Sequence, residues 1–171
     1  PAFADAFTSC IINHDPGSFD YVLFSYHSLP LSQIRKIHPQ HDPERCECMN
    51  EIPFHGEYCY KAVCYATTRL LASRLDLKKE SYSTSFQSRL TRNWLSPFTE
   101  KVIEELPGKD CKNVLVVAPS FVADCLETLI EIRSEYDEMF RKSGGVRLEL
   151  AGSLNDNDEW VDAIIKIAGL I

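Results

Sequence analysis

A histidine at the end of an apolar run is the first side chain with evident chemical potential. Residues 21–30 read Tyr-Val-Leu-Phe-Ser-Tyr-His-Ser-Leu-Pro, a pattern that predicts a buried strand ending near His27. In an open parallel sheet, ligands bind at the carboxyl ends of the strands. His27 would therefore stand where a base or a metal ligand is useful, although a loop histidine held by its serine neighbours fits the same pattern.

A second group of candidates lies on the helix predicted over residues 123–141. At about 100° per residue, its acidic side chains share one face: Asp124, Glu127, Glu131, Glu135 and Glu138. Another face carries the expected core stripe: Val122, Cys125, Leu129, Ile132, Tyr136 and Met139. We expect Glu135 and Glu138 to be solvated, whereas Glu127 and Glu131 start from the same sheet edge as His27. An imidazole facing carboxylates is suited to accepting protons and passing a divalent cation.

Strand-like and helix-like segments alternate around these candidates. Strands are predicted over 21–26, 81–87, 114–118 and 146–151, and helices over 1–10, 57–75, 99–106, 123–141 and 158–168. The segment 28–56 is rich in Pro, His and Cys and is expected to be a long irregular loop. The alternation predicts an α/β fold, a doubly wound, four-stranded parallel sheet with helices on both faces.

Composition excludes several classes of function. The 171 residues suit one domain, and the net charge of −7 argues against a nucleic-acid partner. No apolar stretch reaches the roughly 20 residues of a membrane span. The seven cysteines are not spaced like a secreted disulfide framework, so we expect a reducing, cytoplasmic setting. The first residue is Pro1, which is expected of a processed chain or a cut piece.

Four segments, in order, match one known family. They are 23–30, 85–90 followed by Trp94-Leu95 and Pro97, 121–131, and 153–156. On these segments the chain resembles the C-terminal half of ferrochelatase, the enzyme that inserts ferrous iron into a porphyrin. The resemblance implies that residues 1–171 form the C-terminal domain, with 1–12 a remnant of the preceding helix. It also implies that the N-terminal domain, which completes the porphyrin cleft, is absent, so the piece alone is expected to be a poor or inactive catalyst.

The resemblance also implies roles for individual residues. His27 matches the base or metal contact over the macrocycle, and Glu127 matches its acidic counterpart. Asp124 and Glu131 match outer carboxylates, so the implied metal contacts are His27, Glu127, Asp124 and Glu131. Trp94 matches an aromatic residue that lines the cleft, with a core tryptophan as the alternative.

The loop at 153–156 and two departures complete the comparison with the family pattern. Ser153 and Asn155 match a loop beside the porphyrin, with an ordinary helix cap as the alternative. Cys125 stands where the family commonly has a histidine, so a metal-relay role at this position is in doubt. Thr91 replaces a usual glycine and Trp94 stands one residue closer, which puts the contact of Trp94 in doubt.

Four cysteines raise a separate question. Cys46, Cys48, Cys59 and Cys64 are spaced C-x-C-x10-C-x4-C, and some bacterial members of the family hold a 2Fe–2S cluster on four cysteines. Structural zinc and free thiols are the alternatives. The nearby histidines are expected to be solvated: His38, His41 and His55.

The resemblance thus implies insertion of Fe(II) into a dicarboxylate porphyrin, protoporphyrin IX or coproporphyrin, with loss of two protons. Fe(II) and the porphyrin are the expected partners, and no nucleotide cofactor is expected. Peripheral membrane contact and oligomeric state are left open. A cobalt or nickel chelatase of another tetrapyrrole is the alternative enzyme. A non-catalytic haem- or porphyrin-binding domain, or a periplasmic-binding-protein-like fold, is the alternative outside enzymes.

Overall fold

A four-stranded parallel sheet forms the centre of the molecule. The computed structural model describes residues 2–37, 42, 47–52 and 58–169. The strand order is β2-β1-β3-β4 and all neighbours are parallel. The strands are β1 (Tyr21–His27), β2 (Tyr82–Gln87), β3 (Asn113–Val117) and β4 (Arg147–Leu150). The predicted α/β fold with a parallel sheet is confirmed, and each predicted strand is present with ends shifted by at most one residue.

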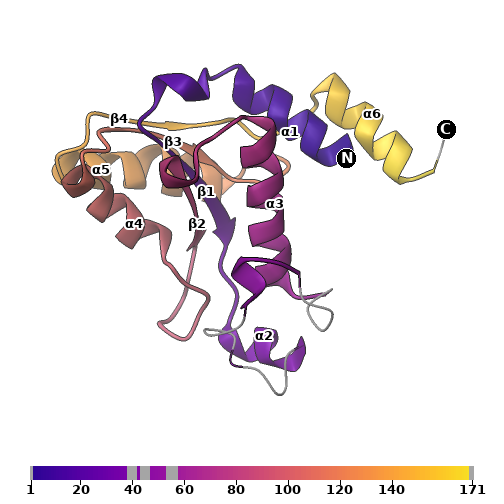
Figure 1. The fold of residues 1–171 in the computed structure, drawn as a ribbon, viewed down its shortest axis with the longest axis horizontal. Helices are drawn as coiled ribbons and strands as arrows, with labels where there is room; N and C mark the ends of the chain where they lie inside the picture. The colour runs from indigo at the N-terminus through magenta and orange to yellow at the C-terminus, as the bar shows by residue number, and fades with distance from the viewer. Residues whose placement is uncertain (1, 38–41, 43–46, 53–57, 170–171) are drawn as a thin grey trace.

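Helices cover both faces of the sheet, and β1 shows why. Alternate residues of a strand point to opposite faces. Phe24 and Tyr26 belong to one buried cluster, whereas Leu23 belongs to the other. The helices α1 (Ala2–Ile12) and α3 (Tyr60–Arg74) contribute to the first cluster, and α6 (Asp158–Ile167) packs on α1. On the other side lie α4 (Thr99–Glu105), the helix η6 (Glu127–Tyr136) and α5 (Asp137–Lys142), as Figure 1 shows for the α-helices.

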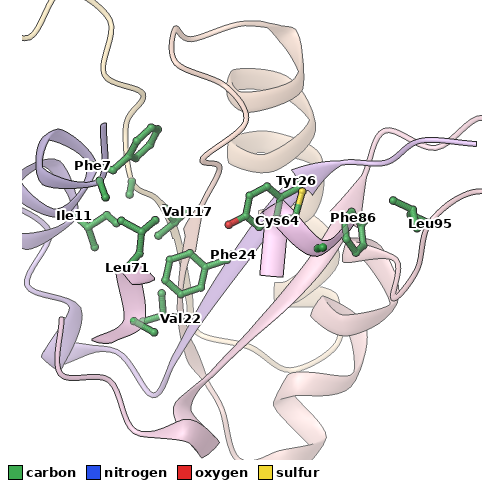
Figure 2. Close-up of a cluster of buried hydrophobic side chains, with 14 of the residues drawn as sticks. Phe7, Ile11, Val22, Phe24, Tyr26, Cys64, Leu71, Phe86, Leu95 and Val117 are labelled. Atoms are coloured by element: carbon green, nitrogen blue, oxygen red, sulfur yellow. The ribbon is translucent and has the colours of Figure 1, made fainter. Parts of the chain in front are cut away.

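Large apolar side chains fill the first cluster. Phe7 and Ile11 of α1 lie in one cluster with Leu71 of α3, Phe24 of β1 and Val117 of β3 (Figure 2). All five are at most 1 % exposed. Full burial of such side chains contributes about 1.5–3 kcal/mol each. This packing fixes the strand that ends in His27.

The segment 28–56 is more ordered than its sequence predicted. It contains the helix α2 (Leu31–Ile37) and the short 3₁₀ turn η2 (Glu47–Met49). The expectation of an irregular segment is therefore wrong for residues 31–37. Leu31 and Ile34 are buried three residues apart, so tertiary packing stabilises a helix too short to show a clear sequence period.

The helix predicted over 123–141 is not a regular α-helix. Residues 127–136 form the π-helix η6, and α5 follows directly. A π-helix joins residues five apart, so the 3.6-residue period does not apply. Ile132 and Tyr136 are buried as predicted, but Val122 is 38 % and Leu129 37 % exposed, which corrects the predicted core stripe.

The remaining helices fit their predictions closely. The predicted segments 99–106 and 158–168 correspond to α4 and α6, and α6 begins where the Asn157 side chain accepts hydrogen bonds from two backbone N–H groups. Within the described part of the chain, no helix has both the length and the apolar character needed to cross a bilayer.

Candidate functional site

His27 lies at the carboxyl end of β1, and its backbone is held from two sides. Its N–H donates to Ser120 Oγ at 3.1 Å, just beyond the end of β3. Its carbonyl accepts a hydrogen bond of 2.8 Å from the Tyr60 hydroxyl at the start of α3. His27 shares strand parity with Leu23, so its side chain is on the sheet face that η6 covers. The backbone of this residue is therefore fixed at the sheet edge.

One hydrogen bond determines the tautomer of the His27 ring. Nδ1 lies 2.5 Å from the carbonyl oxygen of Ser28, and a carbonyl can only accept. Nδ1 must therefore carry the hydrogen, so in the neutral ring Nε2 has a free lone pair. The ring is partly buried, with ring centroids of Trp94 and Phe121 at 6.3 and 6.1 Å. Nε2 is thus the atom that can accept a proton.

Glu127 is the first residue of η6, on the same edge of the sheet. Its pKa is lowered by a hydrogen bond from its own backbone N–H, by one from the Cys125 thiol, and by attraction to His27. Glu127 is therefore a carboxylate at neutral pH. A hollow of about 340 Å³ lies beside it, lined by Leu126, Glu127, Ile130, Glu131 and Glu135. The Glu127 backbone lies beside the end of β2, because its carbonyl accepts from Gln87 Nε2 at 2.9 Å and Gln87 pairs in register with His27.

Asp124 joins the start of this helix to the loop after β4. Its N–H donates to Asn155 Oδ1, and Asn155 Nδ2 donates back to Asp124 Oδ2, both at 2.9 Å. The other oxygen accepts from Ser153 N–H at 3.4 Å and from the Thr128 hydroxyl at 3.3 Å. Burial alone would raise the pKa of Asp124, but hydrogen bonds from Asn155, Ser153 and Thr128 outweigh it and the pKa is lowered. Three predicted site residues, Asp124, Ser153 and Asn155, thus form one cluster.

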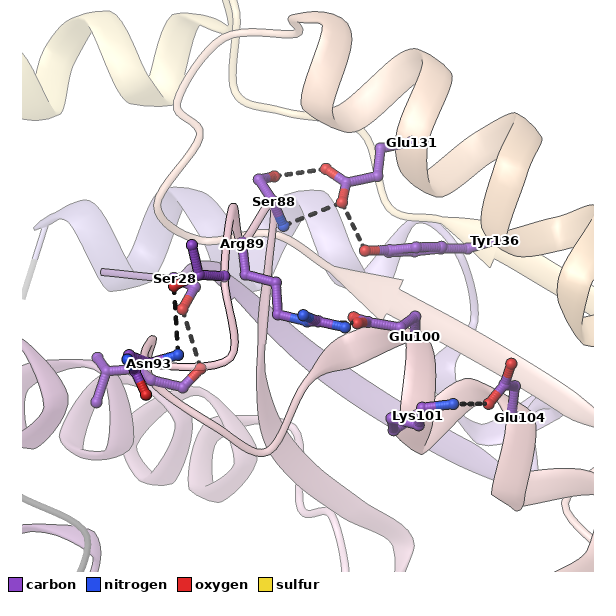
Figure 3. Close-up of polar contacts among 11 residues, drawn as sticks. Ser28, Ser88, Arg89, Asn93, Glu100, Lys101, Glu104, Glu131 and Tyr136 are labelled. Carbon is purple, nitrogen blue, oxygen red and sulfur yellow. Dashed lines mark hydrogen bonds and ion pairs between the residues drawn. The ribbon is translucent and has the colours of Figure 1, made fainter. Parts of the chain in front are cut away.

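Glu131 joins η6 to the end of β2. Its Oε1 accepts from the Ser88 N–H at 3.0 Å and the Tyr136 hydroxyl at 2.6 Å. Its Oε2 accepts from the Ser88 hydroxyl at 2.5 Å and from Gln87 Nε2 at 3.2 Å. Figure 3 shows this carboxylate between Ser88 and Tyr136. Ser88 has a φ of 58°, a left-handed conformation that serine rarely adopts. Four donors therefore already use this carboxylate, and its predicted contact with metal stays a prediction.

Trp94 lies on the segment that follows β2. It forms an isolated antiparallel bridge with Pro30, close to the end of β1. The side chain is partly buried, and its ring centroid lies 6.3 Å from that of His27 with the two rings tilted by 47°. The structure therefore places Trp94 at the His27 edge, and its predicted contact with porphyrin stays a prediction.

Sequence reasoning missed Gln87, Tyr60 and Ser120 as residues of this site. Gln87 lies within the motif at 85–90, and an amide at the end of a buried strand was an available signal. Tyr60 and Ser120 carry no signal in the sequence, because only the fold brings them to the His27 backbone.

The predicted cysteine site does not form a ligand set among the described residues. Cys46 lies outside them, as do His38, His41 and His55. Cys48, Cys59 and Cys64 are at most 2 % exposed within the first hydrophobic cluster. Burial raises the pKa of Cys64 to about 12, which disfavours the thiolate that a metal requires. In the described part of the chain, no three His, Cys, Asp or Glu side chains are grouped to hold a metal ion. The three described cysteines of the motif, as placed here, do not fit a metal cluster.

Comparison with known proteins adds independent information. A family model described as ferrochelatase matches residues 1–169. A ferrochelatase of Pseudomonas fluorescens biotype C is 38 % identical over 167 residues, which is 96 % of this chain and 49 % of the relative. One of Coxiella burnetii (strain Dugway 5J108-111) is 41 % identical over 174 residues, which is 98 % of this chain and 48 % of the relative. The chain thus spans about half the length of the curated relatives it matches. With nearly its whole length matched, the chain belongs to the ferrochelatase family.

Proposed function

We propose that this chain is the C-terminal half of a ferrochelatase, which inserts Fe(II) into a dicarboxylate porphyrin and releases two protons. The observation that supports the proposal is the placement of a histidine lone pair and an ionised glutamate at one edge of the sheet in a member of this family. His27 Nε2 carries the lone pair of the neutral ring, and the lowered pKa of Glu127 keeps that side chain a carboxylate.

Each side chain then has a defined part in the reaction. The porphyrin loses its two pyrrole N–H protons as the metal enters, so a base is needed over the macrocycle. His27 accepts a proton at Nε2, and the Ser28 carbonyl stabilises the resulting imidazolium through Nδ1–H. The Glu127 carboxylate offsets the new positive charge. Loss of that proton to solvent returns His27 to the neutral form for the second transfer.

The surface beside Glu127 suits a flat apolar ligand. Leu126 is 75 % and Ile130 50 % exposed, although both are large apolar side chains. Trp94 and Phe121 flank the His27 ring and offer aromatic faces. We assign the porphyrin to this edge, with Trp94 as a stacking residue and the loop of Ser153 and Asn155 beside it. Asp124 and Glu131, whose oxygens already accept hydrogen bonds, would act as outer carboxylates through their charge and not as a preformed ligand group.

The test is substitution of the two central residues in the natural protein that carries this sequence. His27→Ala and Glu127→Gln are each expected to lower the rate of zinc or iron insertion about 10²- to 10⁴-fold, since a positioned base contributes about that much. Porphyrin affinity, followed by quenching of porphyrin fluorescence, should change little. His14→Gln is the control, because His14 contacts Glu149 and not this site. Full turnover in His27→Ala would overturn the proposal.

The same assays address the alternatives. A cobalt or nickel chelatase would prefer those metals over Fe(II) in competition. A non-catalytic porphyrin-binding domain would bind porphyrin without turnover, before and after His27→Ala. We also propose that the 171-residue chain alone is a poor catalyst, because it spans about half the length of its relatives. Zinc-porphyrin formation by the chain at the rate of a full-length enzyme would contradict this.

The predictions of a 2Fe–2S cluster and of a cytoplasmic setting have their own tests. The six described cysteines are free thiols, which supports a reducing compartment. A 2Fe–2S cluster or zinc on Cys46, Cys48, Cys59 and Cys64 would have to displace the thiol protons of the three described cysteines, Cys48, Cys59 and Cys64, which are buried. Anaerobic purification followed by metal analysis and a visible spectrum decides the matter, because bound iron with sulfur-to-iron absorption would establish the cluster.

A further inference from the structure

A buried amide, Gln87, connects the strand of His27 to the helix of Glu127. Gln87 is the last residue of β2, is 0 % exposed, and pairs in register with His27 of β1. Its Nε2 donates to the backbone carbonyl of Glu127 at 2.9 Å and to Glu131 Oε2 at 3.2 Å. One side chain therefore reaches from β2, the strand next to that of His27, to the first turn of η6.

The orientation of this amide is fixed by its partners. The Glu127 carbonyl and the Glu131 carboxylate can only accept, so the NH₂ group must face them. On the other side, Ser25 Oγ donates to Gln87 Oε1 at 2.6 Å. Ser25 is in turn joined to Thr99 at 2.8 Å, and Thr99 donates to Ser85 at 2.9 Å. The two acceptors on η6 therefore set the orientation of the amide, and the buried hydroxyl of Ser25 meets its oxygen.

We propose that Gln87 is the positioning residue that sets the start of η6, and with it the Glu127 carboxylate, relative to His27. Glu127 is the first residue of η6 and its carbonyl is the group that Gln87 holds, so loss of this bond frees the turn that carries the carboxylate. The inference rests on the proposed function, because positioning Glu127 matters for turnover only if Glu127 and His27 act in the reaction.

The first test measures the helix itself and needs no turnover. In the 171-residue chain, Gln87→Met keeps the length of the side chain but removes both donors. We expect amide hydrogen exchange at Glu131 and Ile132, one turn into η6, to become about tenfold faster or more. Thr99→Val is the matched control, because it removes a buried hydroxyl from the same network without contacting Gln87. Equal acceleration in Thr99→Val, or none in Gln87→Met, would overturn the inference.

The second test separates positioning from folding. In the natural protein, Gln87→Met should lower kcat about tenfold or more while the KM for porphyrin stays within about twofold, since the bond acts on Glu127 and not on ligand affinity. Gln87→Asn retains the amide and should recover part of kcat; it also serves if Gln87→Met does not fold. A raised KM for porphyrin with an unchanged kcat would contradict the inference. Because hydrogen exchange is independent of turnover, failure of the proposed function and failure of this inference give different results.

Discussion

Replacing the Glu131 carboxylate with a neutral amide tests whether this group is structural or is free to bind metal. Glu131→Gln keeps the shape of the side chain but replaces one accepting oxygen with an NH₂ group. The two oxygens of Glu131 accept four hydrogen bonds, two at each oxygen. The substitution therefore loses two of these bonds and turns donors of the new amide toward donors of Ser88, Gln87 or Tyr136.

The magnitude follows from these contacts. A hydrogen bond to a charged group contributes about 1.5–3 kcal/mol, and partial exposure of Glu131 lets water replace some of it. We expect the free energy of unfolding to fall by about 2–4 kcal/mol. For a chain of this size, this corresponds to a Tm lowered by roughly 5–15 °C. A carboxylate without such partners in this acidic helix would give the opposite sign, because neutralising it relieves like-charge repulsion.

Urea unfolding of the 171-residue chain, followed by far-UV circular dichroism, measures the change. Glu135→Gln is the matched control, since Glu135 is an exposed carboxylate four residues further along the same helix. Its free energy of unfolding should stay within about 0.5 kcal/mol of the parent. The reasoning is refuted if Glu131→Gln is as stable as the parent, or if the two variants lose the same stability.

Three further outcomes are expected. Gly145→Ala should cost about 1–3 kcal/mol in urea unfolding, because its Cβ would lie 2.3 Å from two carbons of the buried Phe140 ring, whereas Gly108→Ala meets no atom within 4 Å. Hydrogen bonds from Asn113 lower the pKa of Asp20 in the folded chain. Its contribution to stability is therefore present above the ordinary pKa of 3.8 and is lost as the pH falls through the lower pKa of the folded state. Asp20→Asn should reduce this loss of stability at acid pH, as measured by unfolding at a series of pH values. With a pKa of about 12 and 2 % exposure, Cys64 should resist iodoacetamide at pH 8 in the native chain, before and after treatment with chelator and dithionite, as read by mass spectrometry; labelling that begins only after chelation would indicate a metal ligand.

The sequence alone determined the architecture of this protein. Apolar runs of strand length alternating with helical periods have few packed solutions, so the parallel sheet and the position of His27 at its edge followed from local patterns. The α-helical period failed over 127–136, because a π-helix has a wider turn that the residue pattern does not encode. As a result, Glu131 and Tyr136, five residues apart, share a face and form a hydrogen bond.

Only the tertiary structure decided what each polar residue of the site contacts. The carboxylates of Glu127, Asp124 and Glu131 look equivalent in the sequence. In the structure, Glu127 begins η6 with its backbone held by Gln87, Asp124 binds Asn155, and Glu131 binds Ser88. The reason is that a hydrogen bond tolerates a change of only a few tenths of an ångström in the donor–acceptor distance. Here the donor and the acceptor come from segments far apart in the chain, so only the folded structure sets that distance. A one-dimensional pattern fixes which face or edge a side chain occupies, but its partner is chosen by packing.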